Sequence, residues 1–313
     1  MMIVSAIKCL CFEYAAVRVR EDRLSTLTNG WWVIIDRTGR PLSSREFLWV
    51  GDMVAGVFPV CYESEKDGKE VWSLLCASTG EFYIEEEYDS VPDICNGVAR
   101  VSVAGKGYTY IDVTGVMGWD GWRKEREYFK SASRFLDDVG VVQLANGKYT
   151  YITRGFDGGA VSFFRLTNKV YQFAGVFHDG MSVVVYRKGK HGSYGYVTLR
   201  GLTPLLGGDG KPLSFSHANV FMCGWGLVKD KKGLFNYIDK RGRFISERWF
   251  EAAGPFYECR MGENLKMAVA HVKYNLDSGW ALIDGHGAEC FDVQRFMCNY
   301  DDDTGVGTVG HKK

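Results

Sequence analysis

The chain has 313 residues and a balanced charge, with 38 lysines and arginines against 38 aspartates and glutamates. This balance produces no overall field that would attract nucleic acid or an anionic membrane, so we expect neither as a partner. Aromatic residues make up 14% of the chain, and there are 38 glycines but only 6 prolines. Aromatic residues favour strands and glycine favours turns, so the composition predicts an all-β protein.

The cysteines and the N-terminus bear on the compartment. The nine cysteines are Cys9, Cys11, Cys61, Cys76, Cys95, Cys223, Cys259, Cys290 and Cys298. Their number is odd and no CxxC occurs, so we expect reduced, buried thiols in a reducing compartment, and hence a cytoplasmic protein. The apolar N-terminus is broken by Lys8 and lacks a small-residue cleavage site, so we expect no signal peptide. No run approaches the roughly 18 apolar residues of a membrane span.

A first internal repeat is anchored on small residues that are followed two places later by an aliphatic residue or alanine. The anchors are Ala15, Ala55, Ala99, Gly140, Ser182, Gly226 and Ala268, with spacings of 40, 44, 41, 42, 44 and 42 by subtraction. Five places before each anchor stands an apolar residue, except in the last copy, where Glu263 occupies that place. A small residue would let a neighbouring sheet or an aromatic ring approach closely.

A second anchor is aromatic in every copy. It comprises Trp32, Trp72, Tyr108, Tyr149, Tyr194, Phe235 and Trp280, and each is followed three places later by an aliphatic residue. The next position holds Asp36, Asp112, Asp239 and Asp284 in four copies, and a glycine closes each copy. An aspartate before such a glycine suits a turn, because its carboxylate accepts hydrogen bonds from backbone N–H groups. We therefore predict structural roles for both sets of residues.

These patterns predict seven β units of about 42 residues in one domain over residues 1–298. Both faces of most strands are apolar, so each small sheet must be covered on both sides. A seven-bladed β-propeller meets this need, and Met1–Cys9 is then expected to complete the last blade. The alternative is an open superhelical array of β-hairpin units, which would need capped ends. We favour closure because neither terminus has a polar cap, and we expect residues 299–313 to form a disordered polar tail.

Three segments carry a resemblance to a known family: 97–101 (GVARV), 108–115 (YTYIDVTG) and 233–242 (GLFNYIDKRG). With Tyr88-Asp89 as a third element of the unit, the chain resembles the bacterial WG-repeat (KWG-repeat) family over residues 10–293. It departs from that pattern because the glycine of the Trp-Gly pair survives only as Gly195, and tryptophan in three of seven copies. The resemblance implies a repeat scaffold that binds other proteins and has no assigned activity.

Residues that could perform chemistry show no recognisable pattern. None of the six histidines occurs at metal-ligand spacing, and no phosphate-binding loop or GxSxG motif is present. The repeated aspartates hold equivalent positions, whereas a catalytic acid and base need two different environments. Glu85–Glu87 is expected to be a solvated face. We therefore expect no catalytic residue, no metal and no cofactor.

The segment 117–130 (MGWDGWRKEREYFK) does not follow the repeat. Trp119 and Trp122 lie outside the repeated positions and stand beside Arg123 and Lys124. Tryptophan and arginine are enriched in binding hot spots, so these four residues are candidates for partner binding. The structural alternative is that both rings pack over the edge of a blade. Trp249 is a weaker candidate, because its place matches the Tyr-Asp element of the repeat.

Three functional hypotheses follow. The first is a non-catalytic, monomeric scaffold that binds another protein. The second is a carbohydrate- or small-ligand-binding module that uses exposed aromatic rings. The third is a hydrolase whose carboxylates are dispersed along the sequence, which would require two of them to meet in a cleft.

Replacement of Trp119 and Trp122 by alanine tests the role of the two rings. If they bind a partner, the double variant loses partner capture in a pulldown and keeps a melting curve close to that of the wild type. A large loss of thermal stability would instead assign the rings to the core.

Overall fold

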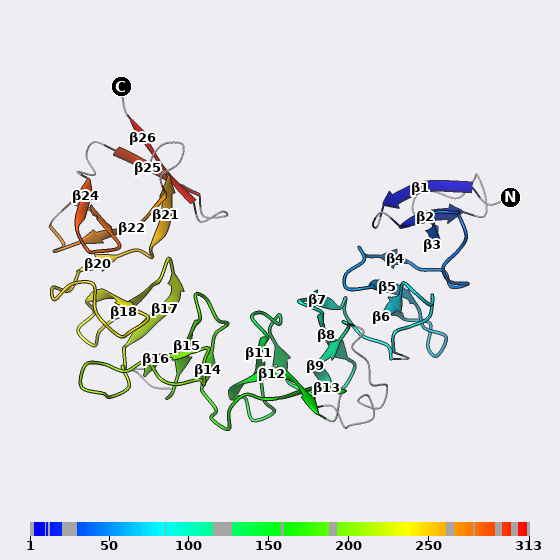
Figure 1. The fold of residues 1–313 in the computed structure, drawn as a ribbon, viewed down its shortest axis with the longest axis horizontal. Helices are drawn as coiled ribbons and strands as arrows, with labels where there is room; N and C mark the ends of the chain where they lie inside the picture. Colours follow the sequence, from blue (N-terminus) through cyan, green and yellow to red (C-terminus); the bar gives the residue numbers. More distant parts are fainter. Residues whose placement is uncertain are drawn as a thin grey trace. The chain divides into compact units, whose positions relative to one another are not determined.

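The computed structural model describes residues 3–9, 11, 13–20, 30–84, 86–114, 127–157, 160–187, 193–260, 266–277, 279–291, 296–301 and 306–311. Over these residues the chain forms 26 strands and no helix, so the all-β prediction is confirmed. Accordingly, this part of the chain contains no helix that could span a membrane. The strands are arranged in seven small sheets, which follow one another in chain order (Figure 1).

The first four sheets contain consecutive strands. They comprise β1 (Ile3–Cys9), β2 (Tyr14–Arg20) and β3 (Trp31–Asp36); β4 (Trp49–Val50), β5 (Val57–Glu63) and β6 (Glu70–Cys76); β7 (Asp93–Cys95), β8 (Val98–Val103) and β9 (Gly107–Asp112); and β10 (Ser131–Ala132), β11 (Val139–Gln143), β12 (Tyr149–Asp157) and β13 (Ala160–Arg165). The strand pairs with a described register are antiparallel, as expected for strands joined by short turns.

Three further sheets complete the chain. They comprise β14 (Phe173–Ala174), β15 (Met181–Val185) and β16 (Tyr194–Thr198); β17 (His217–Met222), β18 (Trp225–Lys229) and β19 (Phe235–Asp239); and β20 (Ala252–Ala253), β21 (Tyr257–Arg260), β22 (Lys266–Lys273), β23 (Ala281–Asp284), β24 (Glu289–Phe291), β25 (Phe296–Asp301) and β26 (Val306–His311). Successive antiparallel sheets of this size have the construction of propeller blades, so the repeat architecture is confirmed.

The chain forms two compact units. One contains residues 1–147 and 151–165, and the other contains residues 148–150 and 166–313. A single domain over residues 1–298 and closure of the seven sheets into a ring stay predictions.

The two sequence anchors lie on adjacent strands of one hairpin. In the third sheet, Ala99 in β8 lies opposite Ile111 in β9, and Ser102 lies opposite Tyr108. Gly105 and Gly107 in the connecting turn have φ values of 76° and 102°, which glycine adopts without steric cost. The predicted Gly-Lys-Gly hairpin is therefore present.

The third element of the repeat, which the sequence marks at Tyr88-Asp89, pairs with the aromatic second anchor of the same repeat. The backbone N–H and C=O of Trp32 exchange hydrogen bonds with those of Phe47, at N–O distances of 2.6 and 2.9 Å. The same reciprocal pairing joins Trp72 to Tyr88, Tyr108 to Phe129, Tyr149 to Tyr171, Tyr194 to Phe215 and Phe235 to Phe250. All six partner rings are buried, so each unit ends in an aromatic side chain inside the core.

Tyrosine side chains join consecutive sheets. The hydroxyl of Tyr110 donates a hydrogen bond to the carbonyl of Ser133 at 2.8 Å, and that of Tyr196 donates to Asn219 at 2.6 Å. Burial raises the pKa of both hydroxyls, which keeps them protonated donors. The Tyr196 ring packs edge-on against Phe221, with ring centroids 4.8 Å apart. A Cβ atom on Gly226 would lie 2.6 Å from the Tyr196 hydroxyl. The small first anchor thus admits the ring of the preceding sheet, as predicted.

The same contact explains why Glu263, and not an apolar residue, stands five places before the last anchor, Ala268. Tyr237 donates to the carbonyl of Gly254 at 2.6 Å, and its ring packs edge-on against Phe256 at 4.8 Å. Phe256 therefore occupies the place that Phe135 and Phe221 hold in earlier sheets. It stands 12 residues before Ala268 instead of five, because β21 is inserted between them.

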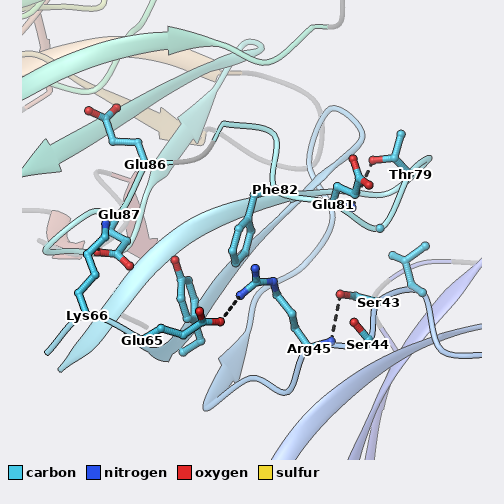
Figure 2. A pocket seen from close by; sticks show the side chains of 13 residues that line it. Ser43, Ser44, Arg45, Glu65, Lys66, Thr79, Glu81, Phe82, Glu86 and Glu87 are labelled. Atoms are coloured by element: carbon cyan, nitrogen blue, oxygen red, sulfur yellow. Dashed lines mark hydrogen bonds and ion pairs between the residues drawn. The ribbon is translucent and has the colours of Figure 1, made fainter. Parts of the chain in front are cut away.

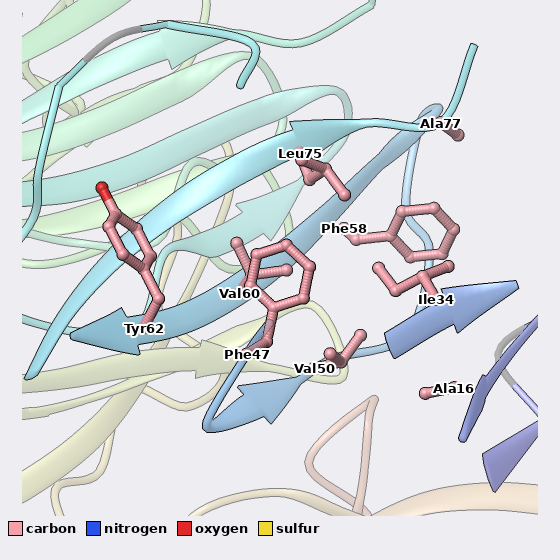
Figure 3. Close-up of a cluster of buried hydrophobic side chains, with 9 residues drawn as sticks. All are labelled: Ala16, Ile34, Phe47, Val50, Phe58, Val60, Tyr62, Leu75 and Ala77. Atoms are coloured by element: carbon pink, nitrogen blue, oxygen red, sulfur yellow. The ribbon is translucent and has the colours of Figure 1, made fainter. Parts of the chain in front are cut away.

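Clusters of apolar side chains fill the space between consecutive sheets. The first lies between the sheet of β1–β3 and that of β4–β6 (Figure 3), and it comprises Ala16, Ile34, Phe47, Val50, Phe58, Val60, Tyr62, Leu75 and Ala77. Phe58 is fully buried there, which stabilises the folded state by about 2 kcal/mol. Similar clusters lie between later sheets of each unit. Within each unit, consecutive sheets thus cover each other's facing sides.

Two expectations about the termini were wrong. Met1–Cys9 was expected to complete the last blade, but its described part, Ile3–Cys9, is β1 and pairs with β2 in the first sheet. Residues 299–301 and 306–311, which were expected to belong to a disordered tail, lie in β25 and β26. These two strands pair with each other, and β26 pairs in parallel with β21, with Glu258 opposite Val306. The inserted strand β21 supplies the edge on which this pairing takes place.

Replacing Gly226 by alanine is expected to lower the free energy of unfolding by about 1–3 kcal/mol. The added methyl group would meet the Tyr196 hydroxyl at 2.6 Å and the Phe221 ring at 2.7 Å. Urea denaturation measures the loss. Gly208→Ala is the matched control, because no atom lies within 4 Å of the added Cβ. Equal stability of the two variants would contradict close packing at this anchor.

Candidate functional site

A groove lined mainly by apolar side chains lies between β14 and β17, and we call it the apolar groove. Its volume is about 800 Å³, and it is lined by Gln172, Phe173, Gly175, Val176, Val183, Val185, Tyr194, His217, Ala218, Asn219 and Val220. β14 and β17 are the edge strands of their sheets, so the groove runs beside exposed strand edges. A volume of this size is within the range of small-ligand sites, about 300–1,000 Å³.

Apolar side chains are exposed in this groove for identifiable reasons. Phe173 is 45% exposed, since β14 is an edge strand of only two residues. Val220 is 41% exposed because the pairing of β17 with β18 shifts register between Ala218 and Phe221. The Tyr196 hydroxyl holds this irregularity through the carbonyl of Asn219. The exposed apolar surface is therefore built into the strand.

A second hollow, which we call the acidic hollow, lies in the other unit. Figure 2 shows the side chains around it, and it has a volume of about 800 Å³. It is lined by Leu42, Ser43, Ser44, Arg45, Tyr62, Glu65, Lys66, Thr79, Gly80, Glu81, Phe82, Glu86 and Glu87. Four carboxylates and two cations are among these residues, which makes the lining net negative by two charges.

Three side chains form a stack in the acidic hollow. The rings of Tyr62 and Phe82 lie 4.9 Å apart with planes 25° from parallel. The guanidinium carbon of Arg45 lies 4.7 Å from the centre of the Phe82 ring, a cation–π contact. Tyr62 comes from β5, and Phe82 is held beside β6 by a bridge to Leu75. The backbone of two neighbouring segments thus positions the rings.

Ion pairs surround this stack. Arg45 lies 3.4 Å from Glu65, whose side chain is 86% exposed, so the pair is worth little in water. Lys66 lies 3.1 Å from Glu87, which also accepts a hydrogen bond from Ser64 at 2.9 Å. Glu86 and Glu87 are half-buried. The expectation of a fully solvated acidic face over Glu85–Glu87 was therefore wrong for these two residues.

Tyr62 has an unusual setting. Only 8% of the residue is exposed, and its hydroxyl points away from the apolar cluster that holds the ring (Figure 3). Burial, together with the charge of Glu87, raises the pKa of the hydroxyl to about 12. The hydroxyl makes no hydrogen bond to any residue that the structure describes. It is thus a protonated polar group that lines the acidic hollow and has no partner there.

The candidate binding residues from the sequence do not meet in either hollow. Trp119, Trp122, Arg123 and Lys124 lie outside the described residues. Trp249 is half-buried and packs against the core between the sheets of β14–β16 and β17–β19, with its ring 5.2 Å from that of Phe244. Its contacts are those of a residue at the edge of the core.

The repeated aspartates make the predicted turn contacts. Asp36 accepts hydrogen bonds from the backbone N–H groups of Thr38 and Arg40, and Asp284 accepts from those of His286 and Ala288. The hydroxyl of Thr38 also donates to Asp36 and holds the pKa of that carboxyl below its usual value.

Two of the repeated aspartates also contact arginine. Asp239 accepts hydrogen bonds from the backbone N–H groups of Arg241 and Arg243, and the guanidinium Nε of Arg243 donates to it at 2.8 Å. Asp112 accepts from the backbone N–H of Thr114. Arg154 in β12 lies 3.0 Å from Asp112, so this turn is also joined to the following sheet.

The cysteines differ in how deeply they are buried. The cysteines whose side chains are described are free thiols; Cys61 and Cys259 are buried, whereas Cys9 and Cys223 are exposed. The expectation of buried thiols thus holds only for some of them. Within the described ranges, no cluster of three or more histidine, cysteine, aspartate or glutamate residues could hold a metal ion.

Neither hollow was predicted from the sequence. Phe173 and His217 each stand two places after a buried aromatic, and those aromatics (Phe47, Tyr88, Phe129, Tyr171 and Phe215) recur at intervals of 41 to 44 residues. That spacing was a usable signal. In contrast, Tyr62 and Phe82 have no sequence signal, because their contact depends on how a loop folds back on β6.

Neither a protein-family model nor the sequence of a curated protein matches this chain. Among solved structures, Hsv2p of Kluyveromyces lactis is 12% identical, with 98% of this chain and 97% of that chain covered and a TM-score of 0.31. BamB from Moraxella catarrhalis is 9% identical, with coverage of 93% and 89% and a TM-score of 0.28. The C-terminal WD40 domain of Sif2 is 12% identical, with coverage of 88% and 80% and a TM-score of 0.27. Similarity at this level carries no argument about function, and membership of the WG-repeat family stays a prediction.

The stability of the Asp239 turn is expected to depend on pH. Although partial burial opposes it, hydrogen bonds from Arg243 and Arg241 lower the pKa of this carboxyl. The carboxylate therefore contributes fully above its unfolded pKa of about 4, and its contribution is lost as the pH falls through the lower folded value. Asp239→Asn should reduce the free energy of unfolding by about 1 kcal/mol at pH 7.

Urea denaturation between pH 5 and pH 3 should show this difference shrinking towards zero. Asp277→Asn is the control, because Asp277 is exposed and makes no hydrogen bond to the described residues. A difference that stays constant over this range would contradict the role of the charge.

Proposed function

We propose that this protein is a non-catalytic interaction scaffold that uses the apolar groove to bind a protein partner. The observation that carries the proposal is the exposure of Phe173 and Val220 along one groove beside two edge strands. Fully burying such a side chain contributes about 1.5–3 kcal/mol. A partner with apolar side chains would therefore gain binding energy from a small contact area.

The form of the groove favours an extended segment of the partner. An exposed sheet edge can add a strand from another chain through backbone hydrogen bonds, while pockets select alternate side chains. β17 offers such an edge, and Val183 and Val185 of β15 line the apolar floor. Gln172, His217 and Asn219 supply polar groups in the same groove. We infer that a partner inserts apolar side chains and pairs its backbone along β17.

The carboxylates support a non-catalytic role. Hydrolysis by paired acids requires one carboxyl to keep its proton in an environment without nearby cations. In the acidic hollow, Glu65 faces Arg45 and Glu87 faces Lys66. The four repeated aspartates accept hydrogen bonds from the backbone of their own turns.

A second candidate function is the binding of a carbohydrate or small apolar ligand in the same groove. The observation that favours it is that Phe173, Tyr194 and His217 place rings in a concave surface of about 800 Å³. Aromatic rings with a few polar groups are typical of small-ligand sites. The two candidates differ in what the wild-type protein retains from a lysate.

The test is a quantitative pulldown from native lysate with the wild type, Val220→Asp and Leu276→Asp. Val220→Asp places a charge in the groove, whereas Leu276 is 73% exposed outside it and provides the matched control. A partner that binds the groove should be retained by the wild type and the control and lost by Val220→Asp. With the purified partner, calorimetry should show at least tenfold weaker binding, about 1.4 kcal/mol.

Two outcomes would contradict the proposal. A partner that binds Val220→Asp as tightly as the wild type would place the interface elsewhere. Recovery of a small molecule instead of a protein, seen by native mass spectrometry and lost in Val220→Asp, would favour the second candidate.

A further inference from the structure

We propose that the acidic hollow of the first unit binds the guanidinium group of an arginine-containing partner peptide. The hollow is lined only by residues 42–87, so it is separate from the apolar groove. The inference goes beyond the proposed function, with which it shares only a protein ligand. Failure of either proposal therefore leaves the other standing.

The hollow already holds one guanidinium group. Arg45 lies over the Phe82 ring at 4.7 Å, and Phe82 in turn stacks on Tyr62. The Arg45 side chain is 46% exposed, and its ion pair with Glu65 is long at 3.4 Å (Figure 2). Such an exposed pair is weak, so Arg45 can leave the ring for little free energy. The chain's own arginine thus shows that a planar cation fits this surface.

The Tyr62 hydroxyl offers an unused hydrogen-bonding group. Tyr62 is 8% exposed and lines the hollow, and its hydroxyl has no partner among the described residues. Because this hydroxyl lies at the hollow, a ligand N–H group can donate a hydrogen bond to its oxygen in place of water. A guanidinium carries five N–H donors in a plane, so it can donate to this oxygen while it lies against a ring.

The charge of the lining selects a cation. Glu65, Glu81, Glu86 and Glu87 outnumber Arg45 and Lys66 by two. An anion would have to displace Glu65 and Glu87 from their cations and would then face the remaining carboxylates. A cation can instead share Glu87 with Lys66, whose side chain is 78% exposed and free to move into solvent. Charge complementarity therefore favours a basic peptide over a phosphorylated one.

Fluorescence anisotropy with a labelled peptide of alternating arginine and glycine tests the proposal. The control peptide carries citrulline in place of arginine, which keeps the shape and removes the charge. The wild type should bind the arginine peptide at least tenfold more tightly than the citrulline peptide. Tyr62→Phe removes one hydroxyl and should weaken binding about fivefold to tenfold, and Glu87→Gln should weaken it about threefold.

Arg45→Ala provides the sharpest discrimination. This change frees the Phe82 ring and makes the lining more negative, so the arginine peptide should bind about threefold to tenfold more tightly. Glu247→Gln, in an exposed loop of the other unit, should leave binding unchanged. Melting curves confirm that each variant is folded; if Tyr62→Phe is not, Arg45→Ala and Glu87→Gln suffice.

Three results would overturn the proposal. The first is that the arginine and citrulline peptides bind equally, or that neither peptide binds. The second is weaker binding of the arginine peptide to Arg45→Ala. The third is binding of a phosphoserine peptide that Arg45→Ala abolishes, which would make the hollow an anion site.

Discussion

The packing of a bulky side chain from one sheet onto a small residue of the next is the contact on which the structure depends. Tyr196 lies against Gly226, and its hydroxyl reaches the backbone of β17. Neither sheet of this pair could bury its apolar face alone, since each has only three strands. The hydrogen bond adds direction to the apolar contact, because a buried carbonyl without a donor would be costly. Together these contacts fix how the facing sides of the two sheets are aligned.

Both candidate sites arise where this packing ends. In the apolar groove, β14 is short and β17 is irregular, so Phe173 and Val220 extend beyond the covered surface. In the acidic hollow, the Tyr62 ring belongs to the core cluster while its hydroxyl faces solvent-side carboxylates. A residue that is half inside a core is held rigidly, which lowers the entropy lost when a ligand binds. The repeat therefore supplies firm positions for groups that the fold itself does not use.

Much of the architecture could be read from the sequence because its units are equivalent. The small anchors, the aromatic second anchors and the turn aspartates recur at regular intervals, and most of them lie where their chemistry predicts. Ala55 is an exception, because it lies in an exposed turn with φ of 52°, and Phe58 takes the place opposite Leu75. Prediction failed where one unit differs from the others. The insertion of β21 moved Phe256 away from its expected spacing and provided an edge for β26. Sequence periodicity cannot reveal which neighbour an irregular segment will pair with.

The sequence by itself determined the all-β class, the number of units and the turn role of Asp36, Asp112, Asp239 and Asp284. These features depend on local rules: alternation along a strand, hydrogen bonding within a turn and the size of an anchor residue. Only the tertiary structure decided where exposed apolar and unpartnered polar groups gather. Tyr62 and Phe82 are 20 residues apart in the chain, and Phe173 and Val220 are 47 apart. Contacts over such separations depend on how loops and strand edges meet, and no local pattern encodes that meeting.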